Sequence, residues 1–115
     1  MIFLKIKMTV LNIVKHLINS EYELIEQLTN GIRLRAVDIK EAIDSYGRTL
    51  IMPPDIEYDN LIDIIEISNS IPKKWSVKFD LWTKEEGKSD LSLEMTLIES
   101  NNELMNVEFD DIHVL

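Results

Sequence analysis

The pattern of apolar and polar positions changes once along the chain, near its middle. Up to about residue 46, apolar side chains recur every three or four positions, a spacing that predicts amphipathic helices. Beyond that point they alternate with polar ones, which predicts strands with one buried face. The sequence therefore predicts an α+β domain, with two or three N-terminal helices packed on a four- or five-stranded, mostly antiparallel β-meander.

The helical half contains both start and stop signals. A first helix is predicted to begin at Thr9, whose hydroxyl suits an N-cap. The periodicity continues through residues 22–28 to the stop signal Asn30-Gly31, as one bent helix or as two. A further helix is predicted over residues 37–46, ended by Gly47.

Strand signals dominate the second half. Residues 49–52 predict a short strand before Pro53-Pro54, and residues 61–67 form a second β-rich run. Two longer strands follow, joined by a turn near Glu86 with Gly87 suited to a positive φ. Their predicted inward side chains are Trp75, Val77, Phe79, Leu81, Leu91, Leu93, Met95 and Leu97. The turn position predicts three cross-strand pairs: Phe79 with Leu93, Val77 with Met95, and Lys78 with Glu94.

Side-chain parity constrains the last hairpin. A two-residue turn would set Leu97 opposite Asn106, whereas an odd-length loop pairs Leu97 with Val107. We predict the odd-length loop. Because apolar side chains then resume out of phase at Ile112, a β-bulge is predicted near Asp110-Asp111, where the carboxylates would lie at a concave rim.

The same parity turns Trp82 away from the face of Trp75 and Phe79. Two interpretations are open for this indole ring. It covers a second core layer if helices pack on that face, or it is exposed as an aromatic anchor for a partner. We favour the first interpretation.

Size and composition bound the class of protein. A chain of 115 residues that is 45% hydrophobic predicts one domain over residues 1–115. The absence of cysteine excludes disulfides and thiolate sites and makes the cytoplasm the expected compartment. We predict neither a signal peptide, because the first apolar run stops after Leu4, nor a transmembrane helix. Met8 is an alternative start, which would make residues 1–7 a dispensable extension.

Acidic residues are concentrated in the second half. The net charge is −9, and residues 51–115 hold fifteen Asp and Glu against five Lys and Arg. Such a field repels phosphate groups, so we expect neither nucleic acid nor a membrane surface as a partner. It attracts a basic protein, although the charge has an alternative role in solubility alone.

The sequence contains no established catalytic or metal-binding motif. His16 and His113 lack zinc-ligand spacing, the glycines are too dispersed for a phosphate loop, and no GxSxG occurs. His113 with Asp110 or Asp111 is a candidate acid–base pair, but an ordinary edge residue is the favoured interpretation. We therefore predict no enzyme activity, no metal and no cofactor. Three acidic clusters remain: Asp55/Glu57/Asp59, Glu85/Glu86/Asp90 and Glu108/Asp110/Asp111.

A resemblance rests on the run D-L-W-T-K-E-E-G-K-S-D-L over residues 80–91, on Leu93-Glu94 and on the terminal D-D-I-H-V-L. With this LWTxEEGxSDL motif the chain resembles a family of small uncharacterised bacterial proteins. The elements Ala42-Ile43-x-x-Tyr46-Gly47 and Pro53-Pro54 fit the same family. The resemblance implies no activity and no catalytic residues. By type, the chain is also similar to immunity proteins of contact-dependent growth inhibition and other polymorphic toxin systems.

Two function hypotheses follow. The first is an immunity protein that binds a cognate, basic, nuclease-type toxin domain and blocks its active site. Its expected contact residues are Trp82, Glu85, Glu86, Asp90, Glu108, Asp110 and Asp111. The second is a small-molecule-binding or enzymatic domain that resembles the cone-shaped nuclear-transport-factor-like fold, with His113 and Asp111 as its acid–base pair in a cavity. A filled core would count against the second hypothesis.

Overall fold

Helices precede strands in the computed structural model, which describes residues 2–54 and 62–115. The helices are α1 (Ile2–Ile18), α2 (Tyr22–Leu28) and α3 (Ala36–Tyr46). The strands are β1 (Leu50–Ile51), β2 (Asp63–Ile67), β3 (Lys74–Thr83), β4 (Gly87–Ile98) and β5 (Asn106–Val114). This order confirms the predicted α+β class and shows that the first helical stretch is two helices.

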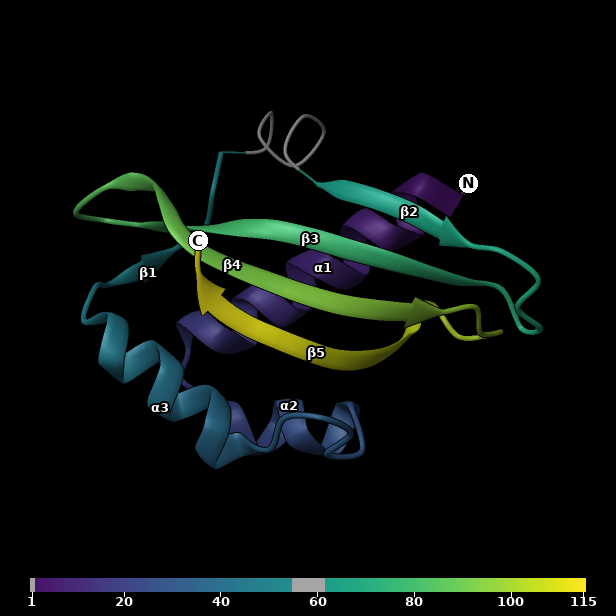
Figure 1. Ribbon diagram of the computed structural model, residues 1–115, viewed down its shortest axis with the longest axis horizontal. Helices are drawn as coiled ribbons and strands as arrows, with labels where there is room; N and C mark the ends of the chain where they lie inside the picture. The colour runs from purple at the N-terminus through teal and green to yellow at the C-terminus, as the bar shows by residue number, and fades with distance from the viewer. Residues whose placement is uncertain (1, 55–61) are drawn as a thin grey trace.

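The strands form one antiparallel sheet in the order β1-β3-β4-β5. β2 also pairs with β3, beside its first half, whereas β1 pairs with the end of β3. Helix α1 crosses behind the sheet, and α2 and α3 lie on the side of β5 (Figure 1). The described helices therefore leave the other face of the sheet uncovered.

Helix α1 supplies the apolar stripe that covers the inner face of the sheet. Its buried positions are Ile6, Thr9, Val10, Ile13, Val14 and Leu17. The prediction that Thr9 is an N-cap is wrong, because the helix begins at Ile2 and Thr9 lies within the stripe. Its hydroxyl donates to the Lys5 carbonyl, the bond of a mid-helix threonine. No helix in the described ranges is long and apolar enough to cross a membrane.

Helix α3 has a defined signal at each end. The backbone N–H of Arg35 donates to the Asp38 carboxylate, which forms part of a capping box. Gly47 ends the helix at φ 71°, a left-handed conformation that favours glycine. Ile39 and Ile43, four residues apart on one side of the helix, are buried, as expected for an amphipathic helix.

The sheet confirms the predicted strand faces and registers. All eight predicted inward side chains of β3 and β4 are buried. In β3 and β4, Phe79 pairs with Leu93, Val77 with Met95, and Lys78 with Glu94. In the last hairpin Leu97 pairs with Val107 and Met95 with Phe109, as an odd-length loop requires.

One irregularity near the β3–β4 turn was not predicted. Pairing passes from Asp80 opposite Ser92 to Trp82 opposite Lys88, so the chain is irregular around Leu81. The buried Ser89 hydroxyl donates to the Leu81 carbonyl at 2.6 Å and compensates for the interrupted ladder. The residue of β4 opposite Trp82 is therefore Lys88, two positions earlier than uninterrupted pairing would give.

The predicted β-bulge is present in β5. Glu94 pairs with Asp111 and Met95 with Phe109, so Asp110 is the extra residue. Two residues of β5 thus oppose one of β4, which keeps Phe109 and Ile112 buried on either side of the bulge.

The bare side of the sheet, called the open face below, is defined by the outward positions of β2 to β5. Trp82 lies on this face, away from Trp75 and Phe79 as predicted. The prediction that helices cover Trp82 is wrong, because the described helices pack on the opposite face of the sheet. The indole ring of Trp82 is half-buried and lies against Gly87. The open face comprises Asp63, Ile65, Ile67, Lys74, Ser76, Lys78, Asp80, Trp82, Lys88, Ser92, Glu94, Thr96, Ile98, Asn106, Glu108, Asp110, Asp111 and His113.

Candidate functional site

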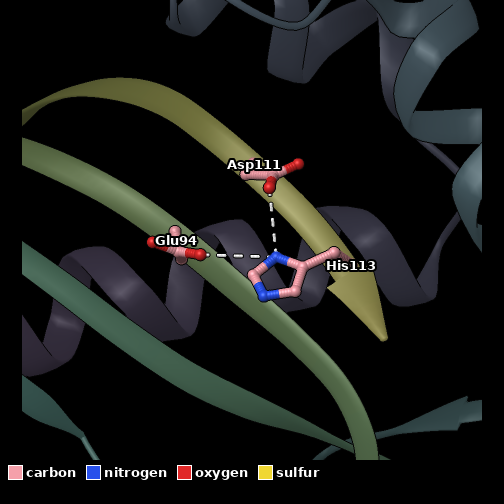
Figure 2. A group of neighbouring side chains, drawn as sticks. All are labelled: Glu94, Asp111 and His113. Carbon is pink, nitrogen blue, oxygen red and sulfur yellow. Dashed lines mark ion pairs between the residues drawn. The ribbon is translucent and has the colours of Figure 1, made fainter. Parts of the chain in front are cut away.

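Two carboxylates and one imidazole meet on the open face, and we name Glu94, Asp111 and His113 the His113 cluster. His113 Nδ1 lies 3.1 Å from Asp111 Oδ2 and 3.3 Å from Glu94 Oε2. Figure 2 shows the imidazole nitrogen pointing between the two carboxylates, one from β4 and one from β5. Residues from two strands therefore converge on a single nitrogen atom.

The β-bulge explains this convergence. Asp111 is directly opposite Glu94, and His113 lies two residues further along the same strand on the same side. If β5 alternated regularly through Asp110, with no bulge, Asp111 would point into the core and Ile112 would point out of it. The bulge therefore keeps Ile112 inside and holds Asp111 and His113 outside.

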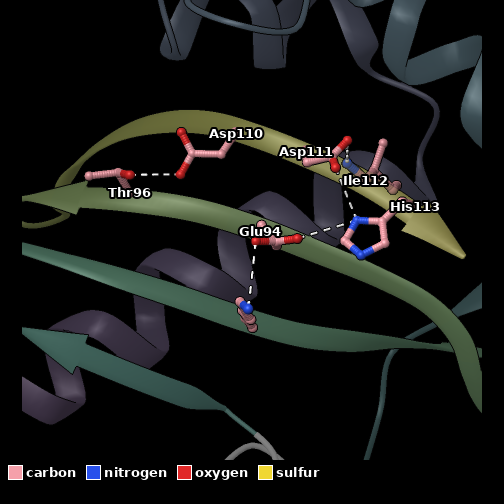
Figure 3. Close-up of polar contacts among 7 residues, drawn as sticks. Glu94, Thr96, Asp110, Asp111, Ile112 and His113 are labelled. Carbon is pink, nitrogen blue, oxygen red and sulfur yellow. Dashed lines mark hydrogen bonds and ion pairs between the residues drawn. The ribbon is translucent and has the colours of Figure 1, made fainter. Parts of the chain in front are cut away.

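Charged and polar neighbours surround the His113 cluster. Lys78 Nζ lies 3.9 Å from Glu94 Oε1, so the two oxygens of Glu94 face different partners. The Thr96 hydroxyl donates to Asp110 Oδ2 at 2.7 Å (Figure 3). Arg33 Nε lies 2.7 Å from Asp110 Oδ1. Asp110 is thus engaged in holding the bulge, whereas Asp111 faces His113.

The chemistry of the His113 cluster is that of an acid–base pair or of a ligand set. His113 Nδ1 is shielded from solvent but makes no well-directed hydrogen bond with the described residues, although both carboxylates approach closely. The short distances are therefore not accompanied by the alignment of a hydrogen bond. Ser92 is opposite His113, yet within the described ranges no hydrogen bond joins them, so the pair lacks the contact of an activated serine.

The second acidic cluster lies at the β3–β4 turn and is held by internal hydrogen bonds. Glu85 accepts from the Thr49 backbone N–H at 2.8 Å and from its hydroxyl at 2.9 Å. These bonds hold the pKa of Glu85 below its ordinary value. Glu86 accepts from the Tyr46 hydroxyl at 2.8 Å, and desolvation, together with this bond, raises the pKa of Tyr46. These two carboxylates therefore anchor the turn to the end of α3 and the start of β1.

The predicted contact residues thus fall into two groups. Trp82, Glu108, Asp110 and Asp111 lie on the open face. Glu85 and Glu86 lie at the β3–β4 turn, and Asp90 lies near the start of β4. The acidic cluster Asp55/Glu57/Asp59 lies outside the described residues. Sequence reasoning missed Glu94, Thr96 and Arg33 as members of the site.

His16, the other histidine, is half-buried near the end of α1. Its Nδ1 lies 3.1 Å from Glu21 Oε1, and this hydrogen bond lowers the pKa of Glu21. The pair joins the end of α1 to the start of α2. Among the described residues, a single carboxylate faces this imidazole, in contrast to the two that face His113.

The space between helices and sheet is filled by side chains. Phe79, Phe109, Leu93 and Met95 are at most 1% exposed. Three surface hollows of about 490, 1030 and 180 Å³ lie on the helical side and beside the β4–β5 loop, and neither Asp111 nor His113 lines any of them. Because Asp111 and His113 face away from the helices, the structure gives no support to a cone-shaped cavity with this pair inside it.

Comparison with known proteins gives a family without a described activity. The family model described as "Domain of unknown function (DUF7668)" matches residues 14–115, from within α1 to the last residue. No match was found among curated proteins or among solved structures. The family description does not test the resemblance to immunity proteins, which stays a prediction. Because the match covers most of its length, the chain belongs to the DUF7668 family.

Proposed function

We propose that this protein is an immunity protein that binds a cognate, basic toxin domain through the open face and neutralises it by covering its active site. The observation that carries the proposal is the acidic character of a sheet face left bare by the helices. Six carboxylates and three lysines project from this face, so its net charge is negative. A basic partner surface is complementary to such a face.

The carboxylates of the open face differ in how much charge they offer a partner. Asp80 is paired with Lys88, Glu94 with Lys78, and Asp110 with Arg33. Asp63 and Glu108 have no ion pair with any described residue. We therefore expect Asp63 and Glu108 to contribute more to attracting a basic partner than the carboxylates with ion pairs.

Trp82 supplies the apolar part of the proposed contact. Its ring is half-buried at one end of the open face, opposite Ile51 of β1. Partly exposed aromatic side chains beside charged ones are typical of the residues that contribute most to protein–protein affinity. The turn carboxylates Glu85 and Glu86 have a smaller role in the proposal, because hydrogen bonds within the protein already engage them.

Capture and rescue test this function together. The tagged protein is used to capture binding proteins from its native strain at low and high salt, and a basic protein captured more weakly at high salt is expected. That partner is then expressed in a host without this chain. Growth arrest that is relieved by co-expression of this chain supports the proposal, whereas a partner without toxicity contradicts it.

A charge-reversal pair tests the surface. Glu108→Lys on the open face and Glu41→Lys on exposed α3 change the net charge equally. We expect Glu108→Lys to slow association with the captured partner by up to about tenfold at low salt, and Glu41→Lys to have little effect. Stopped-flow or surface-plasmon-resonance kinetics measure both. Equal effects of the two variants would assign the attraction to net charge and contradict the open face as the contact.

A further inference from the structure

We propose that the His113 cluster is a binding site for one divalent transition-metal cation, with His113 Nδ1, Asp111 Oδ2 and Glu94 Oε2 as its ligands. The proposal rests on the geometry of these three side chains and is independent of the proposed function. Binding is measured on the protein alone, so failure of one proposal leaves the other standing.

The distances between the donor atoms fit a coordination shell. Each of the three residues offers a ligand atom within 4.8 Å of those of the other two. For an ion about 2.1 Å from each donor, the separations of 3.1 and 3.3 Å correspond to angles of roughly 95° and 105° at the ion. These angles lie between the octahedral and tetrahedral values. Two of the three donor separations therefore already suit a coordination shell.

The environment of His113 Nδ1 is the second observation that points to a cation. This nitrogen is shielded from solvent and lacks a well-directed hydrogen bond within the described part of the chain. Two carboxylate oxygens nevertheless approach it from β4 and β5. A cation placed among the three atoms would give the nitrogen lone pair a partner and would offset the repulsion between the two carboxylates.

The neighbours of the cluster are compatible with ligation. Lys78 contacts Glu94 Oε1, which leaves Oε2 directed at the site. The bulge that sets the position of Asp111 is held by Asp110 through Thr96 and Arg33, so its geometry does not depend on the cation. The three ligands occupy one side of the ion, and water completes its shell from the solvent side.

The donor set indicates the class of cation. One imidazole nitrogen with two carboxylate oxygens suits Zn²⁺, Mn²⁺, Co²⁺ or Ni²⁺, whereas Mg²⁺ and Ca²⁺ prefer oxygen ligands only. Affinity for such a mixed site generally rises from Mn²⁺ through Co²⁺ to Ni²⁺. We therefore expect Ni²⁺ and Zn²⁺ to bind more tightly than Mn²⁺, and Mg²⁺ to compete poorly.

Isothermal titration calorimetry of the apo protein with Zn²⁺ tests the site. We expect one equivalent to bind, and His113→Gln to weaken binding by at least about tenfold. His16→Gln is the matched control, because His16 Nδ1 also lies 3.1 Å from a carboxylate but faces one such group, not two, in the part of the chain that the structure describes. This control variant should bind Zn²⁺ like the unmodified protein.

Two further measurements separate ligation from structural effects. Zn²⁺ should shift the imidazole ¹⁵N resonances of His113 and leave those of His16 in place. It should also raise the melting temperature of the unmodified protein but not that of His113→Gln, whose circular dichroism spectrum is expected to be unchanged. Three results would overturn the proposal: no Zn²⁺ binding, equal binding by the unmodified protein and His113→Gln, or displacement of Zn²⁺ by equimolar Mg²⁺.

Discussion

A single hydroxyl group joins the first helix to the last hairpin. Thr9 is 1% exposed, donates to the Lys5 carbonyl at 2.7 Å and accepts from the Met105 backbone N–H at 3.1 Å. Both bonds lie at the interface between helix and sheet. A polar side chain within the apolar stripe is therefore a structural connection rather than an interruption of the core.

Replacement of Thr9 by valine tests this connection. Valine keeps the shape of the side chain, but the buried Met105 N–H loses its acceptor. We therefore expect the free energy of unfolding to fall by roughly 1–3 kcal/mol. Urea denaturation measures the loss. Thr9→Ser keeps the hydroxyl and should cost less than valine, and the reverse order would contradict the assigned role of the bond.

Glu85 gives the turn a pH dependence at the residue scale. Its pKa is lowered from the ordinary value of 4.5, chiefly by the Thr49 N–H, so its stabilising effect is present above that value and is lost as the pH falls below it. We expect the difference in melting temperature between the unmodified protein and Glu85→Gln to narrow from pH 6 to pH 3. Glu103 is an exposed carboxylate with no hydrogen bond to a described side chain. The difference in melting temperature between the unmodified protein and Glu103→Gln should therefore stay constant over the same pH range.

The membership of the His113 cluster was only partly predictable from the residues. His113 and Asp111 were candidates, but Glu94 was assigned only to Lys78. The missing signal was the combination of two registers, because β4 lies between β3 and β5 and Glu94 faces both neighbours. Side-chain distances and the shielding of Nδ1 depend on rotamers, which alternation along a strand does not specify.

At the scale of elements, long runs of regular alternation were predicted well, whereas the ends of elements were not. The alternation in β3 and β4 defined both registers, because a shift by one residue would expose a whole apolar face. The start of α1 was misplaced, because Thr9 resembles a cap although the stripe extends upstream to Ile6. The irregularity at Leu81 was missed because a serine side chain compensates for it.

Truncation of α1 tests whether residues 1–7 are dispensable. Ile2, Phe3 and Leu4 are more than 40% exposed, whereas Ile6 is 2% exposed and Lys5 Nζ donates to the Ser100 carbonyl. A chain that begins at Met8 should therefore have a free energy of unfolding lower by about 2–5 kcal/mol, as expected when a buried isoleucine is removed. A chain lacking only residues 1–4 should denature near the unmodified midpoint. Equal midpoints for both truncations would show that the extension is dispensable.

On the scale of the whole molecule, the prediction from sequence was correct in class and wrong about one face. Helices before strands and strict alternation predicted a two-layer α+β domain, and the sheet has that form. The sequence did not reveal that all described helices share one side, because Trp82 alone among the outward residues of β3 is large and apolar. One aromatic side chain is too weak a signal for a second buried layer.

The pairing of α1 with the last hairpin has a consequence for how the chain folds as it is made. Lys5 contacts Ser100 and Thr9 contacts Met105, at separations of 95 and 96 residues. During translation the first helix leaves the ribosome well before the strands that bury its apolar stripe. The nascent chain therefore carries an uncovered amphipathic segment until β5 is made, and closing so long a loop makes folding slow compared with that of helical bundles. Until then the stripe is exposed apolar surface, the kind of surface that makes incompletely folded chains prone to aggregation.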